Sequence, residues 1–210
     1  MNEFTYEASR RGTKYETYEW DNTWISRANE HNLPRVLYVG DSISVEVRRS
    51  ARDKVGDKLQ FDQFSTSKGL DNPYFKDMLG AFMRQEERRD IILFNNGLHG
   101  WHLDDETEYK TLYEEMLAYL ISEGHGASVA AVLTTFIRDK AQNERVVKRN
   151  LVVRDIAARM NIPVVDLYSV SFANAEHLTA DGVHYRPEGY SVLADEVIRR
   201  IGEFAPGLPD

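Results

Sequence analysis

Val36-Leu37-Tyr38-Val39-Gly40-Asp41-Ser42-Ile43-Ser44 is the stretch of sequence on which the fold of this chain depends. Its first four residues are apolar without interruption, which is typical of a short strand buried on both faces of a parallel sheet. Gly40 permits a tight turn, and the charged segment 43–55 that follows is predicted to be helical. A buried strand, a turn and a helix form the first half of a βαβ unit.

The same alternation continues towards the C-terminus. Buried strands are predicted at 91–94 and 128–133, a shorter one at 163–167, and an alternating strand nearer an edge at 59–64. Helical patterns separate them, at 73–87, 104–121, 146–160 and 190–201. Strands that alternate with helices of this length predict crossover connections, and so a three-layer α/β/α sandwich around a central parallel sheet of about five strands.

Residues 1–33 differ from the rest of the chain. They are polar and aromatic without a sustained helical or strand period, and their large aromatic residues are Tyr6, Tyr15, Tyr18, Trp20 and Trp24. Pro34 then interrupts the chain. We expect an N-terminal arm, 1–33, that lays its aromatic residues on one domain, 34–210, because no repeat, low-complexity tract or linker divides the remainder.

Composition excludes several classes of function. The 210 residues include no cysteine, which excludes a disulfide framework, a thiol nucleophile and iron–sulfur ligation. A net charge of −8 argues against a nucleic-acid partner, since phosphate contacts need clustered Lys and Arg. No apolar run approaches the length of about 20 residues that membrane insertion requires.

The N-terminus, Met1-Asn2-Glu3-Phe4, has no basic start followed by an apolar stretch, so no signal peptide is predicted. The compartment stays open between the cytoplasm and, for a trimmed protein, the periplasm or the exterior. The sequence does not indicate an oligomeric state.

Two polar segments stand where a parallel sheet binds its ligands, beyond the carboxyl ends of strands. Ser42 would begin the helix after the first strand, where its own N–H and the helix dipole suit a nucleophile whose attack creates an oxyanion. The alternative is that Ser42 or Asp41 is only the helix N-cap.

Near the C-terminus, Asp181 and His184 are three residues apart in a glycine-containing turn. Such a carboxylate can orient an imidazole that deprotonates a serine, although an Asx turn with a surface histidine fits the same residues.

Together, Gly40-Asp41-Ser42 and Asp181-Gly182-Val183-His184 resemble the terminal blocks of the SGNH (GDSL) hydrolase superfamily, in the right order over residues ~35 to ~202. The resemblance implies a flavodoxin-like fold in which Ser42 is the nucleophile, His184 the base and Asp181 the third member of a triad. This chemistry needs no metal and no cofactor. No G-x-S-x-G elbow occurs in the chain, which argues against the α/β-hydrolase solution.

The same resemblance implies an oxyanion hole made from the N–H of Ser42, a glycine N–H and an asparagine amide. Gly69 is the glycine candidate, and its alternative is an ordinary loop glycine. The asparagine block departs from the family pattern, because Asn95-Asn96-Gly97-Leu98-His99 replaces Gly-x-Asn-Asp. Matching the end of the strand assigns the amide to Asn95 or Asn96, whereas matching Gly97 puts His99 in that slot.

The remaining candidates concern the substrate. We expect Asp41, His99, Trp101 and Thr134 to line its site, with Trp101 offering a face for a sugar ring. The alternative is that Trp101 packs the loop down and that His99 and His102 are solvated. Asp166 is expected to cap a helix or form a turn.

The expected function is hydrolysis of a short acyl ester, acetyl in the first instance, on a glycan or small molecule. Lipid-like esters remain an alternative, as does a carbohydrate-binding protein that has lost the chemistry. A zinc hydrolase built on His99, His102, Asp104 and Asp105, with His184 as a further candidate ligand, is another alternative, although its ligand spacing is poor.

Overall fold

A sheet of six strands runs through the middle of the molecule, in the order β1-β3-β2-β4-β5-β6. The structure is a computed structural model and describes residues 15–86, 88–103 and 105–204. Five strands are parallel to one another: β2 (Arg35–Gly40), β3 (Gln60–Thr66), β4 (Ile91–Phe94), β5 (Ser128–Val132) and β6 (Val164–Val165). The sixth, β1 (Asp21–Trp24), pairs antiparallel with β3.

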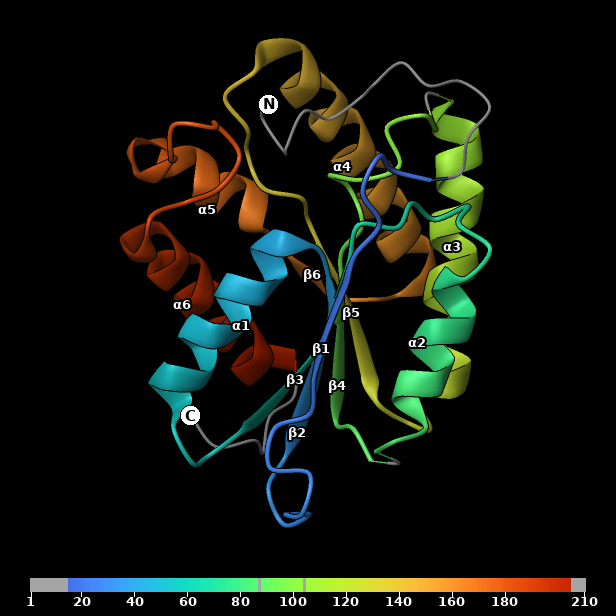
Figure 1. Ribbon diagram of the computed structural model, residues 1–210, viewed down its shortest axis with the longest axis vertical. Coiled ribbons are helices and arrows are strands. Elements are labelled where there is room, and N and C mark those ends of the chain that lie inside the picture. Colours follow the sequence, from blue (N-terminus) through green and yellow to red (C-terminus); the bar gives the residue numbers. More distant parts are fainter. Residues whose placement is uncertain (1–14, 87, 104, 205–210) are drawn as a thin grey trace.

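Helices cover both faces of this sheet (Figure 1). One face carries α1 (Ser42–Val55), α5 (Leu167–Ala173) and α6 (Pro187–Phe204), and a 3₁₀ turn, η1 (Ala175–His177), follows α5. The other face carries α2 (Phe75–Met83), α3 (Glu106–Glu123) and α4 (Lys140–Met160). The predicted three-layer α/β/α sandwich is therefore confirmed.

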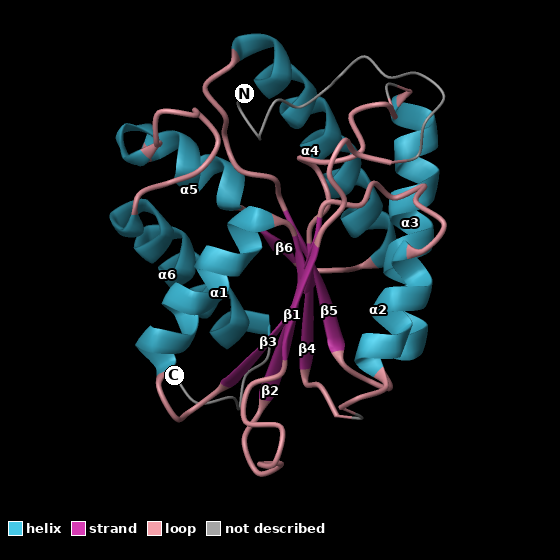
Figure 2. Ribbon diagram, in the orientation of Figure 1, coloured by secondary structure: helices cyan, strands magenta, loops and turns pink. Residues whose placement is uncertain are grey.

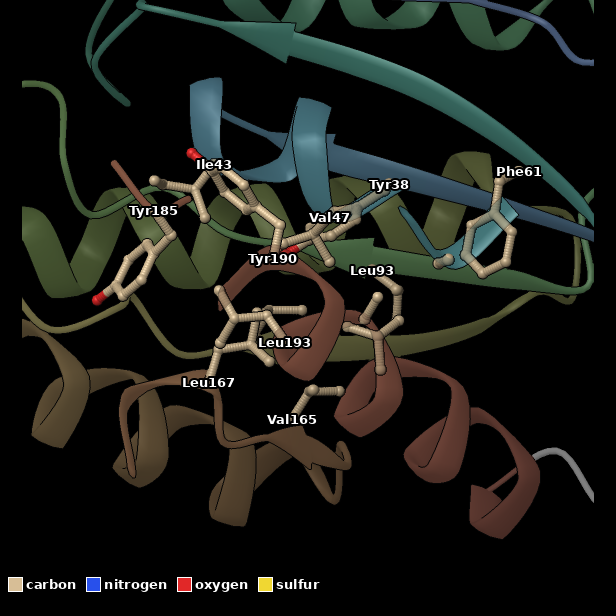
Figure 3. Packing of buried hydrophobic residues seen from close by; sticks show 14 of the residues in the cluster. Tyr38, Ile43, Val47, Phe61, Leu93, Val165, Leu167, Tyr185, Tyr190 and Leu193 are labelled. Atoms are coloured by element: carbon tan, nitrogen blue, oxygen red, sulfur yellow. The ribbon is translucent and has the colours of Figure 1, made fainter. Parts of the chain in front are cut away.

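The alternation of side chains along each strand divides the core into two halves. Val36 and Tyr38 of β2 point towards α1 and α6, whereas Leu37 and Val39 point towards α2 and α3. Figure 3 shows the first half, where Val47 of α1 and Leu193 of α6 meet the side chains of the sheet. Because β2 is apolar on both sides, it belongs in the centre of the sheet, as its sequence predicts.

The sheet differs from the prediction at its edge. About five parallel strands were expected, and β1 is an additional antiparallel strand supplied by the N-terminal segment. β3 was expected nearer an edge, yet all seven of its residues are buried because β1 covers its outer side. The segment predicted as a strand at 163–167 is shorter, since Asp166 ends it by capping α5, where it accepts a hydrogen bond from the N–H of Ser169 at 3.0 Å. That capping role of Asp166 was expected.

Residues of the predicted arm are attached through polar groups and through two aromatic rings, since the ring of Trp20 meets that of His99 and the guanidinium of Arg48 lies 5.7 Å from the ring of Trp24. Tyr15, Tyr18 and Trp24 are about half exposed or more, and Tyr6 lies outside the described residues. Ser26 instead donates its N–H to the buried carboxylate of Asp62 at 3.0 Å, and Arg35 lies 2.7 Å from the same carboxylate. In the described part of the chain, no helix is both long enough and apolar enough to cross a membrane.

The strand order places a switch point between β2 and β4. From β2 the chain moves first to β3 on one side, and later to β4, β5 and β6 on the other. The loops that leave β2 and β4 therefore diverge to opposite faces of the sheet, which opens the crevice where ligands of such folds bind. α1 begins just after the carboxyl end of β2 (Figure 2), and Ser42 is its first residue.

Candidate active site

Ser42, His184 and Asp181 form a continuous hydrogen-bonded chain. The hydroxyl oxygen of Ser42 lies 2.8 Å from Nε2 of His184, although 142 residues separate the two in sequence. Nδ1 of His184 lies 2.8 Å from Oδ2 of Asp181. A carboxylate only accepts hydrogen bonds, so Nδ1 carries the proton and Nε2 is left as the acceptor for Ser42. In this arrangement Nε2 of His184 can accept the proton of the Ser42 hydroxyl, as a general base does for a serine nucleophile.

Asp181 is held in its ionised form by the turn around it. Its Oδ1 accepts hydrogen bonds from the N–H of Val183 at 2.9 Å, the N–H of His184 at 3.0 Å and the hydroxyl of Thr179 at 2.7 Å. Burial by itself would raise the pKa of Asp181, but these hydrogen bonds, together with that to His184, outweigh it and hold the pKa well below its ordinary range. The carboxylate can therefore orient the imidazole and stabilise its charged form.

The N-cap of α1 is Asp41. Its Oδ1 accepts the N–H of Ile43 at 2.9 Å, so the capping role proposed as the alternative for these residues belongs to Asp41. Ser42 is left free to face His184. Burial raises the pKa of Asp41, and the neighbouring His99 and His184 partly offset that effect. Asp41 directly precedes Ser42 and is buried, with only 3% of its surface exposed.

The N–H groups of Ser42 and Gly69 are the predicted backbone donors of an oxyanion hole. Among the described residues, none takes a hydrogen bond from the N–H of Ser42 or of Gly69. Gly69 follows β3, the parallel neighbour of β2, so both donors lie beyond the carboxyl ends of adjacent strands. Gly69 has a structural reason to be glycine, since a Cβ there would lie 2.9 Å from the Cα of Gly100.

The two asparagines after β4 differ in whether they have an amide hydrogen left to donate to an oxyanion. Asn95 donates one amide hydrogen to the carbonyl of Val132 at 2.8 Å and the other to the hydroxyl of Thr134 at 3.0 Å, so it has none left for an oxyanion. Asn96 donates one to the carbonyl of Lys68 at 2.9 Å. Of the two predicted donors, Asn96 is thus the one that keeps an amide hydrogen.

The residues expected to line the substrate site differ in how far they are exposed. Trp101 is only 2% exposed and lies under the guanidinium groups of Arg145 and Arg149, each 5.1 Å from its ring, so its faces are not available to a sugar. Thr134 is also buried, and its hydroxyl accepts a hydrogen bond from the amide of Asn95. His99 is partly exposed and lies 3.6 Å from the carboxylate of Glu16.

The alternative zinc site is not assembled. Nε2 of His102 lies 2.9 Å from Asp71, while Asp105 caps α3, and Asp104 lies outside the described residues. Within the described ranges, no group of three or more His, Asp or Glu side chains could hold a metal ion.

Sequence reasoning missed several residues of this region. Thr179 could have been suspected, because it lies two residues before Asp181 in the same turn and its hydroxyl can reach that carboxylate. Arg149 and Glu16 carry no such local signal. Arg149 belongs to the predicted helix 146–160, whose apolar residues point to packing in the core and not to a functional site. The partners of the Glu16 carboxylate are at least 83 residues further along the chain.

Solved structures similar to this one share its fold over about four fifths of the chain, at low sequence identity. An acetyl xylan esterase superposes with a TM-score of 0.64 and 18% identity, covering 80% of this chain and 99% of its own. A member of the lipolytic G-D-S-L family from Veillonella parvula has a TM-score of 0.62 and 17% identity, with coverages of 79% and 96%. The aryl esterase of M. smegmatis has a TM-score of 0.65 and 11% identity, with coverages of 81% and 99%.

No protein-family model and no curated protein sequence matches this chain. The likeness is thus one of structure. It establishes for this chain the fold of the SGNH (GDSL) hydrolases, as the resemblance of its sequence blocks implied.

Proposed function

We propose that this protein is a serine ester hydrolase that works through an acyl-enzyme. The observation that carries the proposal is the unbroken chain from Ser42 through His184 to Asp181, with 2.8 Å at both contacts. An acid, an imidazole and a hydroxyl in this order are the components of serine acyl transfer on several unrelated folds.

The first half of the reaction forms the acyl-enzyme. Nε2 of His184 accepts the proton of Ser42 as Oγ attacks the carbonyl carbon of the ester, and the carbonyl electron pair moves to its oxygen. That oxyanion would accept hydrogen bonds from the N–H groups of Ser42 and Gly69 and from the amide of Asn96. When the oxyanion collapses, the bond to the leaving oxygen breaks, and His184 gives its proton to the departing alcohol.

The second half releases the acid. Nε2 of His184 takes a proton from a water molecule as the water oxygen attacks the acyl carbon. Collapse of the second tetrahedral intermediate breaks the bond to Oγ, and the proton returns to Ser42. The sum is one ester and one water converted to one alcohol and one carboxylic acid.

We propose a short acyl group, acetyl in the first instance, carried on a carbohydrate. An aromatic cluster supports a sugar as the alcohol part of the ester. Phe136, Tyr168 and Phe172 contact one another, and the rings of Tyr168 and Phe172 are stacked with their centroids 6.4 Å apart. Phe172 is 59% exposed. The cluster is connected to the segment that carries His184, because the hydroxyl of the next residue, Tyr185, donates a hydrogen bond to the carbonyl of Phe136 at 2.6 Å. The leaving alcohol would lie on the side of His184, and aromatic faces suit sugar rings.

The test combines a nucleophile variant with a matched control. Ser42→Ala is expected to abolish hydrolysis of p-nitrophenyl acetate and covalent labelling by a fluorophosphonate, whereas Ser50→Ala on the same helix keeps both. Turnover by Ser42→Ala at the wild-type rate would refute the proposal.

Substrate class is tested separately. A series of p-nitrophenyl esters of increasing chain length, together with acetate release from acetylated xylo-oligosaccharides, should favour acetyl esters and the glycan. A preference for long acyl chains would instead indicate a lipid-directed enzyme. Binding of the acetylated glycan without any turnover would indicate a binding protein.

A further inference from the structure

Residues 16–21, immediately before and at the start of β1, contact the loop that carries Gly69. The carbonyl of Trp20 accepts hydrogen bonds from the N–H of Ser67 at 3.1 Å and the hydroxyl of Thr66 at 3.2 Å. In return, Ser67 Oγ accepts the N–H of Trp20 at 2.9 Å. Nζ of Lys68, only 6% exposed, lies 2.7 Å from the carboxylate of Asp21. The segment thus holds the residues directly before Gly69.

The same segment contacts the loop that follows β4. Oε1 of Glu16 accepts the N–H of Gly100 at 2.8 Å and lies 3.6 Å from Nδ1 of His99. The ring of Trp20 meets the ring of His99 edge-on, with centroids 6.1 Å apart. This short N-terminal segment therefore reaches both loops at the edge of the sheet where Ser42 lies.

Arg149 holds the second loop from the opposite side. Its side chain is buried on α4 and donates to the carbonyls of Gly97 at 3.0 Å, His99 at 2.8 Å and Gly100 at 2.7 Å. The peptide unit between His99 and Gly100 is consequently bound at both ends, its carbonyl by the guanidinium and its N–H by the carboxylate of Glu16. In a planar trans peptide these two groups point in opposite directions, so the unit cannot rotate without losing one charge-assisted hydrogen bond.

The two loops are also in direct contact. Gly69 and Gly100 leave no room for a Cβ between them, and Asn96 donates to the carbonyl of Lys68 at 2.9 Å. A displacement of either loop would therefore move the N–H of Gly69 relative to the amide of Asn96. Donors to an oxyanion accelerate a reaction only when they are fixed before the charge develops.

We propose that the segment from Glu16 to Asp21 is a positioning element of the oxyanion hole, with Glu16 as its principal residue and Arg149 as its counterpart from the core. This inference rests on the proposed function. Neither residue touches the reacting atoms; they act through the backbone of the loops that carry Gly69 and Asn96.

The experiment compares Glu16→Ala, Glu16→Gln and Asp21→Asn in the full chain. Glu144→Gln, which removes the same charge from an exposed position on α4, is the matched control. kcat and KM for p-nitrophenyl acetate are measured on protein whose active sites have been titrated with a fluorophosphonate, so that a lower folded fraction does not enter kcat. Inhibition by a small alkylboronic acid, whose adduct with Ser42 mimics the tetrahedral oxyanion, gives a second reading.

Glu16→Ala is expected to lower kcat by about 10- to 100-fold with KM within about twofold, because misplaced donors weaken only transition-state binding. The boronic acid should lose affinity by a similar factor. Glu16→Gln should retain part of the activity, since its amide oxygen can still accept the N–H of Gly100. Glu144→Gln should match the wild type. An unchanged kcat in Glu16→Ala, or a loss confined to KM, would overturn the proposal.

Hydrogen exchange separates this inference from the proposed function. Amide exchange in 96–103 should rise in Glu16→Ala, and exchange in 66–72 should rise in Asp21→Asn, with neither change in Glu144→Gln. Wild-type exchange in both loops would refute the positioning role whatever the activity. A wild-type protein without esterase activity, combined with raised exchange in the variants, would refute the proposed function and retain the positioning role.

Discussion

Gly69 and Gly100 approach each other so closely that neither position has room for a side chain. A Cβ on Gly69 would lie 2.9 Å from the Cα of Gly100, and a Cβ on Gly100 would lie 3.0 Å from the Cα of Gly69. The obstructing atoms are backbone, which cannot turn aside as the end of a flexible side chain can. Two loops that follow different strands therefore meet at this point only because both residues are glycine.

Gly69→Ala is expected to separate these loops. We expect kcat for an acetyl ester to fall by about 10- to 100-fold, since a donor displaced by about 1 Å costs that much. The crowding should lower the free energy of unfolding by about 1–3 kcal/mol. Steady-state kinetics and urea denaturation measure the two effects.

Gly56→Ala is the control for this variant. Gly56 has φ of +58°, and nothing beyond its own chain neighbours lies within 4 Å of the place a Cβ would take, so alanine there is strained without being crowded. It should lower stability and leave kcat unchanged. Equal kcat values for Gly69→Ala and Gly56→Ala would contradict the role of the close approach.

Asn96→Ala and Asn95→Ala should have different consequences. Removing the amide of Asn96 is expected to lower kcat by about 10²- to 10³-fold, the usual effect of losing one oxyanion donor. Asn95→Ala leaves the carbonyl of Val132 without its hydrogen bond, so its main effect should be a loss of about 1–3 kcal/mol in stability. Kinetics on folded protein and thermal denaturation distinguish them. A larger kcat loss in Asn95→Ala would transfer the donor role to Asn95.

Thr179→Val should shift the titration of Asp181. The native pKa of this carboxyl is held below its unfolded value of about 3.9, so its stabilising contribution is present above that value and is lost as pH falls through the native pKa. Removing the hydroxyl that donates at 2.7 Å should raise the native pKa, and the contribution should then be lost at a higher pH. A ¹³C NMR titration of the Asp181 carboxyl measures it, and an unmoved midpoint would show that Thr179 does not lower this pKa.

Asp62→Asn should destabilise the fold strongly. Asp62 is fully buried, 2.7 Å from the guanidinium of Arg35, and loss of its charge leaves that buried cation with only the more distant Glu86, at 3.7 Å, as a counter-charge. We expect a loss of about 3–5 kcal/mol in the free energy of unfolding. Asp57→Asn is the matched control, because Asp57 pairs with Arg27 at the surface, where solvent screens the pair and its loss should hardly change stability. Similar losses in urea denaturation of the two variants would contradict this difference.

Phe172→Ala tests the proposed carbohydrate side of the site. We expect KM for an acetylated xylo-oligosaccharide to rise by about 3- to 10-fold, since one aromatic contact contributes about 0.5–1.5 kcal/mol. The kinetics of p-nitrophenyl acetate should not change. Leu151→Ala, at a similarly exposed position on α4, is the control. An unchanged KM for the glycan would remove the aromatic cluster from the substrate site.

The parts of the fold that could be predicted are those with a strong local pattern. The continuous apolar run at Val36–Val39 predicts a central strand, and the stripe through Tyr109, Tyr113 and Leu117 predicts α3 to within two residues at each end. β1 could not be predicted, because its four residues are exposed and show no alternation. It is held by its pairing with β3 and by the ion pair of Asp21 with Lys68.

The candidate site divides in the same way. Asp181 and His184 lie within one turn, so their spacing already indicates how a carboxylate can meet an imidazole. Which asparagine keeps an amide hydrogen depended instead on Val132, Thr134 and Lys68, all from other strands or loops. Trp101 is covered by Arg145 and Arg149 of α4, and no sequence pattern near Trp101 predicts these contacts.

The sequence by itself determined the α/β/α architecture and the order of Ser42, Asp181 and His184, because burial patterns and short turns are local properties of the chain. Only the tertiary structure decided whether Asn95 or Asn96 keeps an amide hydrogen and where the N-terminal segment lies. Those outcomes depend on contacts such as that of Glu16 with Gly100, 84 residues apart, in which each hydrogen bond to one partner removes that group from every other.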